Sequence, residues 1–406
     1  MKKAVVLGGT RPHVELIRQL RERGYYVILL DALSNPVASG FSDEHHRVST
    51  LDCEAVLEYC AKAKVDLVIS SCIDQANVTA CYVAEALSLP RPYSTQTALA
   101  VTNKPVMKQM MLEAGVPTSR FVSFHAASRP AFDFDFPVIV KPADANSSKG
   151  IRVASTQAEL SSSVLEAAKV SRTGEVVVEE FVFGEEVGLD MYVDGATPVL
   201  LTSRERLKIN QPGITEQQIT GCIWPADICR EYENEICAVA KRIVDSFGLS
   251  NTPLLVQAIM DGSRINIIEF AARIGGGENF RIIPLLTGFN AIGASIDSFL
   301  NVKPSVKIEQ RDGYYGTYFI YTTGGVFDSI GGLSELMDSG GIEYFDALKA
   351  PGSVVGGGLA SSNRVAVFAL RGMDKARMDL DAQEIVKLIK VFNPEGEDIM
   401  RRDIYC

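Results

Sequence analysis

Glu269 and Arg273 lie at the end of an apolar stretch that runs into glycines, Arg264-Ile-Asn-Ile-Ile-Glu-Phe-Ala-Ala-Arg-Ile-Gly-Gly-Gly277. A carboxylate among apolar residues is costly unless a cation pairs with it or it holds a metal. Glycines let the backbone come close to a bound ligand. We therefore expect Glu269 and Arg273 to belong to a site that a cation and an anionic substrate share.

Two lysines stand at positions that suit a bound anion. Lys141 ends the apolar stretch Pro137–Pro142, so it is expected to point from a packed strand into a site. Lys104 follows Asn103 at the start of a predicted helix, where a cation opposes the helix dipole unless an anion lies nearby. A solvated surface lysine is the alternative in both cases, and it stays open for Lys104.

A small, polar segment joins Lys141 to the strand that begins at Ile151. Backbone amides and hydroxyls in such a turn can wrap phosphates, although a plain turn is the alternative. The segment lacks the G-x-x-x-x-G-K-[ST] pattern, and Gly8-Gly9-Thr10 lacks the G-x-G-x-x-G pattern of dinucleotide sites.

Glu179 and Glu180 are adjacent carboxylates within the predicted strand Val176–Phe181, and two more carboxylates follow Gly184. Side chains alternate along a strand, so Glu179 and Glu180 point to opposite faces, where one can meet a ligand and the other the solvent. An edge strand with protective charges is the alternative.

Gln257 and Glu269 lie on two predicted strands that turn at Asp261-Gly262. The antiparallel pairing allows both side chains to project to one side. An amide oxygen and a carboxylate are hard ligands that suit Mg²⁺, which completes its shell with water and nucleotide phosphates.

Strand-like and helix-like stretches alternate over the first ninety or so residues. This order favours a parallel sheet with helices on both faces, which binds ligands at the carboxyl ends of its strands, here Gly8–Thr10, Asp31 and Ser70–Asp74. The expected strands are Ala4–Leu7, Tyr26–Asp31 and Val65–Ser70, and the expected helices are Pro12–Arg23, Asp52–Lys62 and Asp74–Leu87.

The rest of the chain mixes strands and helices in an α+β manner. The expected strands are Arg120–Phe124, Pro137–Pro142, Ile151–Ala154, Val176–Phe181, Glu186–Val193, Pro198–Arg206, Leu254–Met260, Ile265–Phe270, Tyr314–Tyr321 and Arg364–Leu370. The expected helices are Lys104–Ala114, Gln157–Val170, Glu231–Phe247 and Ala382–Val391.

The composition sets limits on the class of protein. At 406 residues, with 47% hydrophobic and 22% charged residues, the chain suits a globular protein of several domains. A net charge of −10 argues against nucleic acid or an acidic membrane as partner. The eight cysteines form no C-x-x-C pair, so we expect reduced thiols in a cytoplasmic protein.

Taken in chain order, Lys104, Lys141, the Ser147–Gly150 turn, Glu179–Glu186, Gln257 and Glu269-x-x-x-Arg273 resemble the ATP-grasp superfamily. The chain is similar in particular to its carboxylate–amine ligases, such as amino-acid ligases, and to the large subunit of carbamoyl-phosphate synthetase. The resemblance covers nearly the whole chain. It implies a doubly wound, parallel-sheet domain in 1–92, a two-lobed ATP-grasp domain in 93–310 with a lid lobe at about 118–187, and an α+β segment in 311–406.

The resemblance also implies roles for these residues, with ATP lying between two lobes. Lys104 and Lys141 would contact the phosphates and the adenine edge. Glu179 and the Val182 backbone would contact the adenine, and Glu186 would bind the ribose hydroxyls. Ser147, Ser148 and Gly150 would close over the phosphates as a lid. Gln257 and Glu269 would bind Mg²⁺, for which Mn²⁺ can substitute, while Lys141 and Arg273 would carry the catalysis.

One position departs from the pattern. The family ends in Glu-x-Asn-x-Arg, but Ala271 stands where the asparagine is expected, which puts a second metal in doubt.

The activity that the resemblance implies is an ADP-forming ligase reaction: a small carboxylate, such as an amino acid, is phosphorylated to an acyl phosphate and joined to an amine. A bicarbonate- or purine-type carboxylase or synthetase, and a non-catalytic ATP-binding sensor, are the alternatives. The expected partners are small molecules, without nucleic acid or membrane, and a homodimer is common in similar enzymes. The acceptor pocket is expected to come from Thr10–His13, Asp74, Arg204–Lys208 and Gly275–Asn279.

Overall fold

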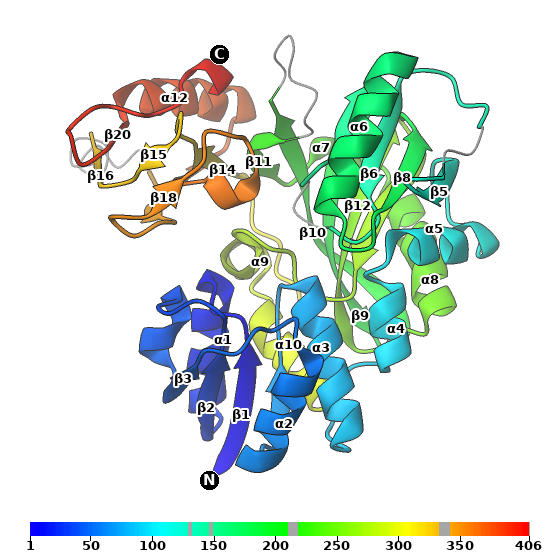
Figure 1. Cartoon of the computed structure of the whole chain (residues 1–406), viewed down its shortest axis with the longest axis vertical. Coiled ribbons are helices and arrows are strands. Elements are labelled where there is room, and N and C mark those ends of the chain that lie inside the picture. The colour runs from blue at the N-terminus through cyan, green and yellow to red at the C-terminus, as the bar shows by residue number, and fades with distance from the viewer. Residues whose placement is uncertain (129–131, 146–148, 210–217, 333–341, 406) are drawn as a thin grey trace. The chain divides into compact units, whose positions relative to one another are not determined.

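The computed structural model describes residues 1–128, 132–145, 149–209, 218–332 and 342–405 (Figure 1). The chain divides into two compact units, each of which is discontinuous in sequence. Unit 1 consists of Met1–Thr118, Gly188–Ser203 and Ile228–Arg311, and unit 2 of Ser119–Val187, Arg204–Asp227 and Asp312–Cys406. The domains expected from the sequence, with boundaries near 92 and 310, are continuous in sequence, whereas these units are not. Those boundaries stay a prediction.

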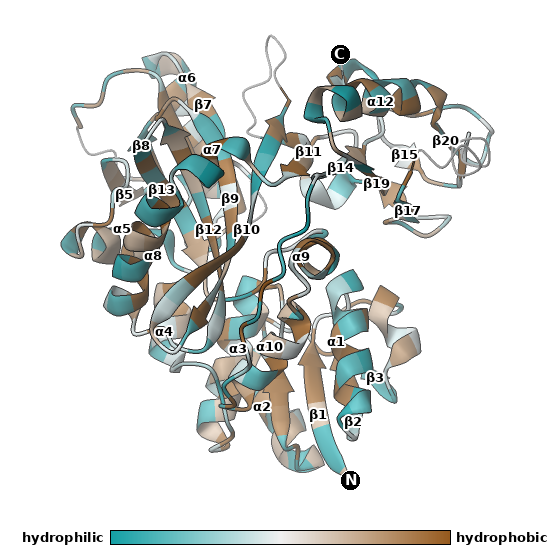
Figure 2. Ribbon diagram, turned by 180° about the vertical axis from the view of Figure 1, so that it is seen from behind, coloured by the Kyte–Doolittle hydropathy of each residue, from teal (hydrophilic) through white to brown (hydrophobic). Residues whose placement is uncertain are grey.

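Unit 1 contains the expected parallel sheet, with strand order β3-β2-β1-β4. β1 (Lys2–Leu7) pairs in parallel with β2 (Tyr25–Leu30) and with β4 (Leu67–Ile69). β3 (Glu44–His46), a short edge strand, was not predicted. Figure 2 shows β1 as hydrophobic except at its N-terminal end, as expected for a strand that is buried on both faces of a parallel sheet.

Helices cover both faces of this sheet. The chain passes from β1 through α1 (Arg11–Glu22) to β2, and from β3 through α2 (Cys53–Ala63) back to β4 on the other side of β1. Right-handed crossovers in opposite directions place α1 and α2 on opposite faces. α3 (Asp74–Ala86) follows β4. β2 and β3 lie on one side of β1 and β4 lies on the other, so the direction in which the chain builds the sheet reverses between β1 and β4. The carboxyl ends of these two strands therefore form the switch point at which such sheets bind ligands.

A second part of unit 1 is antiparallel. β12 (Thr252–Asp261) and β13 (Arg264–Ala271) form the predicted hairpin, with Gly262 in the turn at a φ of +58°. β12 also neighbours β9 (Glu185–Asp194). α10 (Ala291–Phe299) packs against α1 and β12, and its residues join the core of the parallel sheet.

The longer runs of paired strands in unit 2 fall into two groups. The first has the order β5-β8-β6-β7 and packs against α6 (Gln157–Val170), the helix that the sequence predicted with the same bounds. The second contains β11, β14, β19 and β17. Their strands are β5 (Phe121–His125), β6 (Val138–Pro142), β7 (Arg152–Ala154), β8 (Glu175–Glu180), β11 (Ile219–Trp224), β14 (Tyr314–Ile320), β17 (Tyr344–Ala347) and β19 (Ala366–Gly372).

The predicted final helix, Ala382–Val391, was wrong in both bounds. α12 spans Lys375–Leu388, because the side chain of Asp374 accepts a hydrogen bond from the Arg377 amide and starts the helix earlier. The residues after α12 form β20 (Lys390–Phe392), which pairs with β16 (Ser329–Gly331).

The remaining elements complete the described chain. They are η1 (Val37–Phe41), α4 (Thr95–Ala100), α5 (Lys104–Glu113), β10 (Thr197–Lys208), α7 (Asp227–Glu231), α8 (Glu233–Phe247), α9 (Asn279–Thr287), β15 (Gly325–Val326), β18 (Val354–Val355), η2 (Ser361–Asn363) and η3 (Asp403–Tyr405). Within the described ranges no single helix is long and apolar enough to cross a membrane, and only α9 and α10 together, bent by 111°, meet that test.

Gly221 offers a test of the packing in unit 2. It lies in β11 opposite Tyr318 of β14, and a Cβ there would lie 2.3 Å from the Thr317 carbonyl oxygen. Gly221→Ala should lower the free energy of unfolding by about 1–3 kcal/mol, because the added methyl group forces the strands apart. Urea unfolding followed through Trp224, the single tryptophan of the chain, measures this change.

Gly372→Ala is the matched control, since the nearest atom to its Cβ would be 3.6 Å away. We expect this substitution to change the free energy of unfolding by less than about 0.5 kcal/mol. Equal stabilities for the two variants would contradict the strand packing described for β11 and β14.

Candidate functional site

The β12–β13 hairpin places Gln257 directly opposite Glu269. The register shifts immediately after Gln257, and such a bulge re-aims the side chains beside it. The chain near Thr118 supports the bulge, because the Ile267 amide donates to the Pro117 carbonyl over 2.8 Å and the Thr118 hydroxyl donates to the Ile267 carbonyl over 2.8 Å. The two strands thus pair as predicted, with the amide residue opposite the carboxylate residue.

Lys104 lies beside Glu269. Its Nζ is 3.3 Å from Glu269 Oε2, and the Asn103 side chain caps α5 by accepting from the Val106 amide over 3.1 Å. The anion that the helix start requires next to Lys104 is therefore supplied by the protein itself.

The donor set on the hairpin fits Mg²⁺. The described residues contain no group of three or more His, Cys, Asp or Glu side chains that could hold a metal. Mg²⁺ does not need one, because it commonly uses one or two protein oxygens and keeps waters and phosphates for the rest. Gln257 and Glu269 provide those oxygens, and the Glu269 side chain is 32% exposed. Ala271 pairs with Leu255 instead, so a methyl group stands where the resemblance predicts an amide.

Arg273 forms a two-pronged ion pair with Asp74, the first residue of α3. Its Nε donates to Asp74 Oδ1 over 2.7 Å, and its Nη2 donates to Oδ2 over 2.8 Å. Its Nη1 donates to the Ile274 carbonyl over 2.8 Å. Burial alone would lower the pKa of Arg273, but the Asp74 charge outweighs burial and the pKa is raised. The guanidinium therefore stays a cation.

The loop after β1 is fixed by Asp31, at the end of β2. Asp31 Oδ2 accepts from the Gly9 amide over 2.8 Å, and Oδ1 accepts from the Leu33 amide over 2.8 Å. A Cβ on Gly9 would lie 2.4 Å from Pro36, which explains the glycine. The carboxylate holds the switch-point loop in shape.

His13 lies fully buried beneath this loop. Its Nδ1 accepts from the Thr10 amide over 3.2 Å and lies 2.8 Å from the Thr10 hydroxyl. Burial lowers the pKa of His13 to about 4, against a smaller opposing effect of Asp31. Because Nδ1 accepts, the proton of the neutral ring lies on Nε2. The sequence offered His13 as a substrate contact or as a capping or packing residue, and its bond from the Thr10 amide is that of a cap at the start of α1.

The Gly275–Asn279 segment is tied down on both sides. Arg11 Nη1 lies 2.9 Å from the buried Glu278 Oε1, and Asn279 Nδ2 donates to Asp190 Oδ1. A Cβ on Gly275 would lie 2.2 Å from Asn279 Nδ2, so the glycine is required there.

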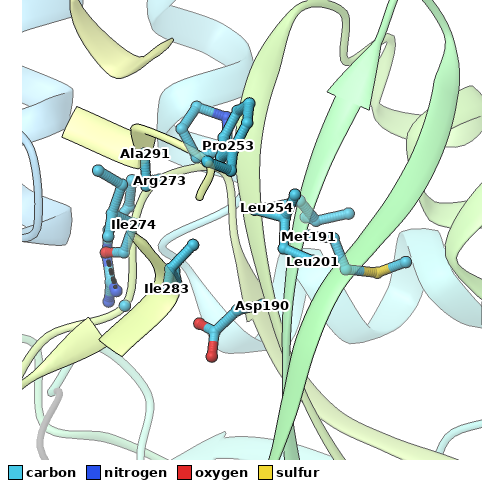
Figure 3. A pocket seen from close by; sticks show the side chains of 11 residues that line it. Asp190, Met191, Leu201, Pro253, Leu254, Arg273, Ile274, Ile283 and Ala291 are labelled. Atoms are coloured by element: carbon cyan, nitrogen blue, oxygen red, sulfur yellow. Dashed lines mark hydrogen bonds between the residues drawn. The ribbon is translucent and has the colours of Figure 1, made fainter. Parts of the chain in front are cut away.

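A small cavity lies beside this segment, and its walls are mainly apolar (Figure 3). Asp190 and Arg273 are the charged residues among those that line it. The space suffices for roughly one water molecule, which is too little for a substrate side chain.

Unit 2 holds a buried ion pair between Lys141 and Glu179. Lys141 Nζ lies 2.8 Å from Glu179 Oε1, and the Ser119 hydroxyl donates to Glu179 Oε2 over 2.7 Å. Glu179 pairs with Ile139, two residues before Lys141, so the ion pair runs diagonally on one face of the sheet. Both Glu179 oxygens therefore have protein partners, and Glu179 is placed to orient Lys141.

Glu186 lies between two cations of β10. Arg206 Nη1 is 2.6 Å from its Oε1, and Lys208 Nζ is 2.9 Å from its Oε2. Burial raises the pKa of Glu186, but the two cations outweigh it and the pKa is lowered. The sequence analysis assigned Arg204–Lys208 to the acceptor pocket. Because side chains alternate along a strand, the spacing of Arg206 and Lys208 already indicated that both lie on the same face.

The remaining predicted residues are placed as follows. Val182 lies in the connection between β8 and β9. Gly150 has a φ of +72°, and a Cβ there would lie 3.0 Å from Pro142. Ser147 and Ser148 lie outside the described residues. Ser119 was missed, because a lone serine before a strand carries no sequence signal.

Residues 134–280 match the family model described as ATP-grasp domain. The chain is 29% identical over 161 residues to D-alanine–D-alanine ligase of Pediococcus pentosaceus, covering 37% of this chain and 43% of that protein. It is 26% identical over 306 residues to phosphoribosylamine–glycine ligase of Synechocystis sp., covering 70% of this chain and 71% of that protein. The match thus spans less than half of the first relative's length.

Solved structures share the fold. L-amino acid ligase from Bacillus licheniformis superposes with a TM-score of 0.79 at 19% identity, covering 96% of this chain and 98% of that one. The biotin carboxylase domain of Hydrogenobacter thermophilus 2-oxoglutarate carboxylase, in complex with MgADP, ADP and bicarbonate, has a TM-score of 0.75 at 15% identity, covering 99% and 92%. The architecture expected from the sequence is confirmed.

The Lys141–Glu179 pair gives a prediction for stability. Lys141→Met removes the cation from a carboxylate that is only 4% exposed, and should lower the free energy of unfolding of unit 2 by about 3–5 kcal/mol. The double variant Lys141→Met, Glu179→Leu should regain most of this loss, because no buried charge is left behind. Urea unfolding followed by Trp224 fluorescence measures both.

Arg120→Met is the control, because its pair with Glu180 is largely exposed. We expect a change below about 1 kcal/mol. If Lys141→Met is as stable as the wild type, the pair is not buried in solution.

His13 gives a prediction for pH dependence. Its pKa is about 4 in the folded chain, against an ordinary value of 6.5 for an exposed histidine. Between these two pH values the ring is protonated in the unfolded chain and neutral in the folded chain. The free energy of unfolding therefore falls as the pH decreases from 6.5 to about 4. NMR titration of the histidine ring protons, assigned with His13→Gln, should give a midpoint near 4 and the Nε2–H tautomer. A midpoint near 6.5 would refute the buried, neutral ring.

Proposed function

The chain carries an ATP-grasp domain, and from this premise we propose that it is an ADP-forming enzyme that joins a small carboxylate, an amino acid, to an amine. The observation that carries the proposal is the pairing of Gln257 with Glu269 at the hairpin, with Lys104 beside them and Arg273 at the strand end. Two of the reported relatives are named as ligases, one of D-alanine with D-alanine and one of phosphoribosylamine with glycine. The substrates of this chain are our inference.

ATP and Mg²⁺ are the cofactors. Gln257 and Glu269 hold the metal, which when bound neutralises charge on the phosphates. In unit 2, Lys141 contacts the phosphates and Glu179 orients it, while Val182 and Gly150 border the nucleotide. The two carboxylate oxygens of Glu186 already pair with Arg206 and Lys208. To contact the ribose hydroxyls, Glu186 must accept their hydrogen bonds in addition to these ion pairs.

The reaction needs no covalent bond to the protein. A carboxylate oxygen attacks the γ-phosphorus, and the bond from that phosphorus to the ADP oxygen breaks. A neutral amine then attacks the acyl carbon, the carbon–oxygen bond to phosphate breaks, and the nitrogen loses its extra proton as phosphate leaves. Arg273 holds the acceptor carboxylate by two parallel hydrogen bonds, so the protein contributes by positioning and charge.

A screen of ADP release separates this proposal from the alternatives. The wild-type protein is incubated with Mg·ATP and pairs of amino acids, then with bicarbonate and an amine. Release with amino acids supports the ligase, and release only with bicarbonate supports a carboxylase-type reaction. Binding of Mg·ATP with no ADP release under any mixture supports the sensor, which Ala271 in place of a metal ligand would favour.

We also propose a cytoplasmic setting, in which the seven described cysteines, which form no disulfide here, stay reduced. Small-molecule substrates and a homodimer complete the proposal, and the mass of the particle in solution tests the dimer.

Glu269→Gln tests the metal assignment. The substitution removes the charge of one of two proposed ligands with little change in shape, so ADP release should fall at least about 100-fold and require a higher Mg²⁺ concentration. Asp261→Asn, at the far end of the same hairpin, is the control and should keep its rate. Turnover of Glu269→Gln close to that of the wild type would remove Glu269 from the metal site.

A further inference from the structure

Arg273 and Asp74 form a bidentate ion pair at the switch point of the parallel sheet. Two prongs join the side chains, from Arg273 Nε to Asp74 Oδ1 and from Nη2 to Oδ2, and Arg273 also donates from Nη1 to the Ile274 carbonyl, a bond drawn in Figure 3. The Arg273 side chain is 13% exposed and the Asp74 side chain 18% exposed. The pair is therefore largely withdrawn from water but still reachable.

Each half of the pair has support that does not come from the other. Asp74 opens α3, where the helix dipole favours an anion. Arg273 is anchored by Nη1 to Ile274 of its own segment. The Nε–Nη2 edge can therefore take another carboxylate without release of the side chain from its place.

A simple carboxylic acid is a poor occupant of this site. If its carboxylate takes the Nε–Nη2 edge of Arg273, Asp74 is left as a nearly buried carboxylate without a cation, which is strongly unfavourable. An α-amino acid brings both charges in one molecule. Its carboxylate replaces Asp74 at the arginine and its ammonium replaces Arg273 at the aspartate, so no charge is left unpaired.

We propose that Arg273 and Asp74 are the specificity site for a zwitterionic α-amino acid as the acyl-donating substrate, with Asp74 as the acceptor for its ammonium group. This inference rests on the proposed function and deepens it. An ammonium held by Asp74 has no lone pair, so the first amino acid cannot act as the amine that attacks the acyl phosphate. The site thereby separates the roles of two similar substrates.

The test compares each amino acid with its des-amino analogue, such as alanine with propionate, in the ADP-release assay. We expect kcat/KM of the wild type to favour the amino acid by at least about 100-fold, because the analogue leaves a site charge unpaired. In Asp74→Asn, kcat/KM for the amino acid should fall by about 100-fold and that for the analogue should stay equal or rise, so the preference is lost.

Asp52→Asn is the matched control. Asp52 also lies at a helix start of the same sheet module, where its side chain caps α2, and asparagine caps equally well. This variant should keep the wild-type preference. Asp74→Glu, which retains the charge, should keep the preference at a lower rate.

Calorimetry with Mg·ATP distinguishes loss of specificity from loss of fold, since Asp74→Asn should bind the nucleotide as the wild type does. Equal use of the amino acid and its analogue by the wild type would overturn the inference while leaving the ligase proposal intact. Equal loss for both substrates in Asp74→Asn, with nucleotide binding unchanged, would overturn it as well. ADP release only with bicarbonate would overturn the inference and the proposed function together.

Discussion

A carboxylate that is withdrawn from water must keep a cation beside it, and this constraint organises the candidate residues of both units. Four of the candidate carboxylates each have a lysine or arginine partner within the same unit. The pairs are Asp74 with Arg273, Glu269 with Lys104, Glu179 with Lys141, and Glu186 with Arg206 and Lys208. Each of these carboxylates therefore has a cation beside it before any substrate binds, and a bound nucleotide, metal or acceptor changes the partners of existing charges.

The sequence predicted those features that depend on local rules. The Asp261-Gly262 turn predicted the antiparallel hairpin, and the register shift next to Gln257 then brings Gln257 opposite Glu269. Alternation along β8 predicted that Glu179 and Glu180 face opposite ways, and one is buried with Lys141 while the other meets Arg120. The parallel sheet followed from the order of its strands and helices.

The sequence could not reveal which charges meet, because tertiary packing decides this. Asp74 and Arg273 are 199 residues apart, and nothing in the local pattern of either names the other. Glu186 illustrates the same limit, since the resemblance gave it a sugar contact and the fold gives it two cations. The bounds of α12 failed for a local reason, because the cap at Asp374 precedes the apolar stretch on which the helix prediction was based.

The division of the chain has a consequence for its synthesis. The polypeptide passes from one unit to the other after residues 118, 187, 203, 227 and 311. Unit 1 is incomplete until residue 311 has left the ribosome, and unit 2 until the C-terminal segment has followed. Domains that are continuous in sequence can fold one after another as they emerge. In this chain both cores stay unfinished until late in translation, so apolar strands remain exposed for longer than in a chain with continuous domains.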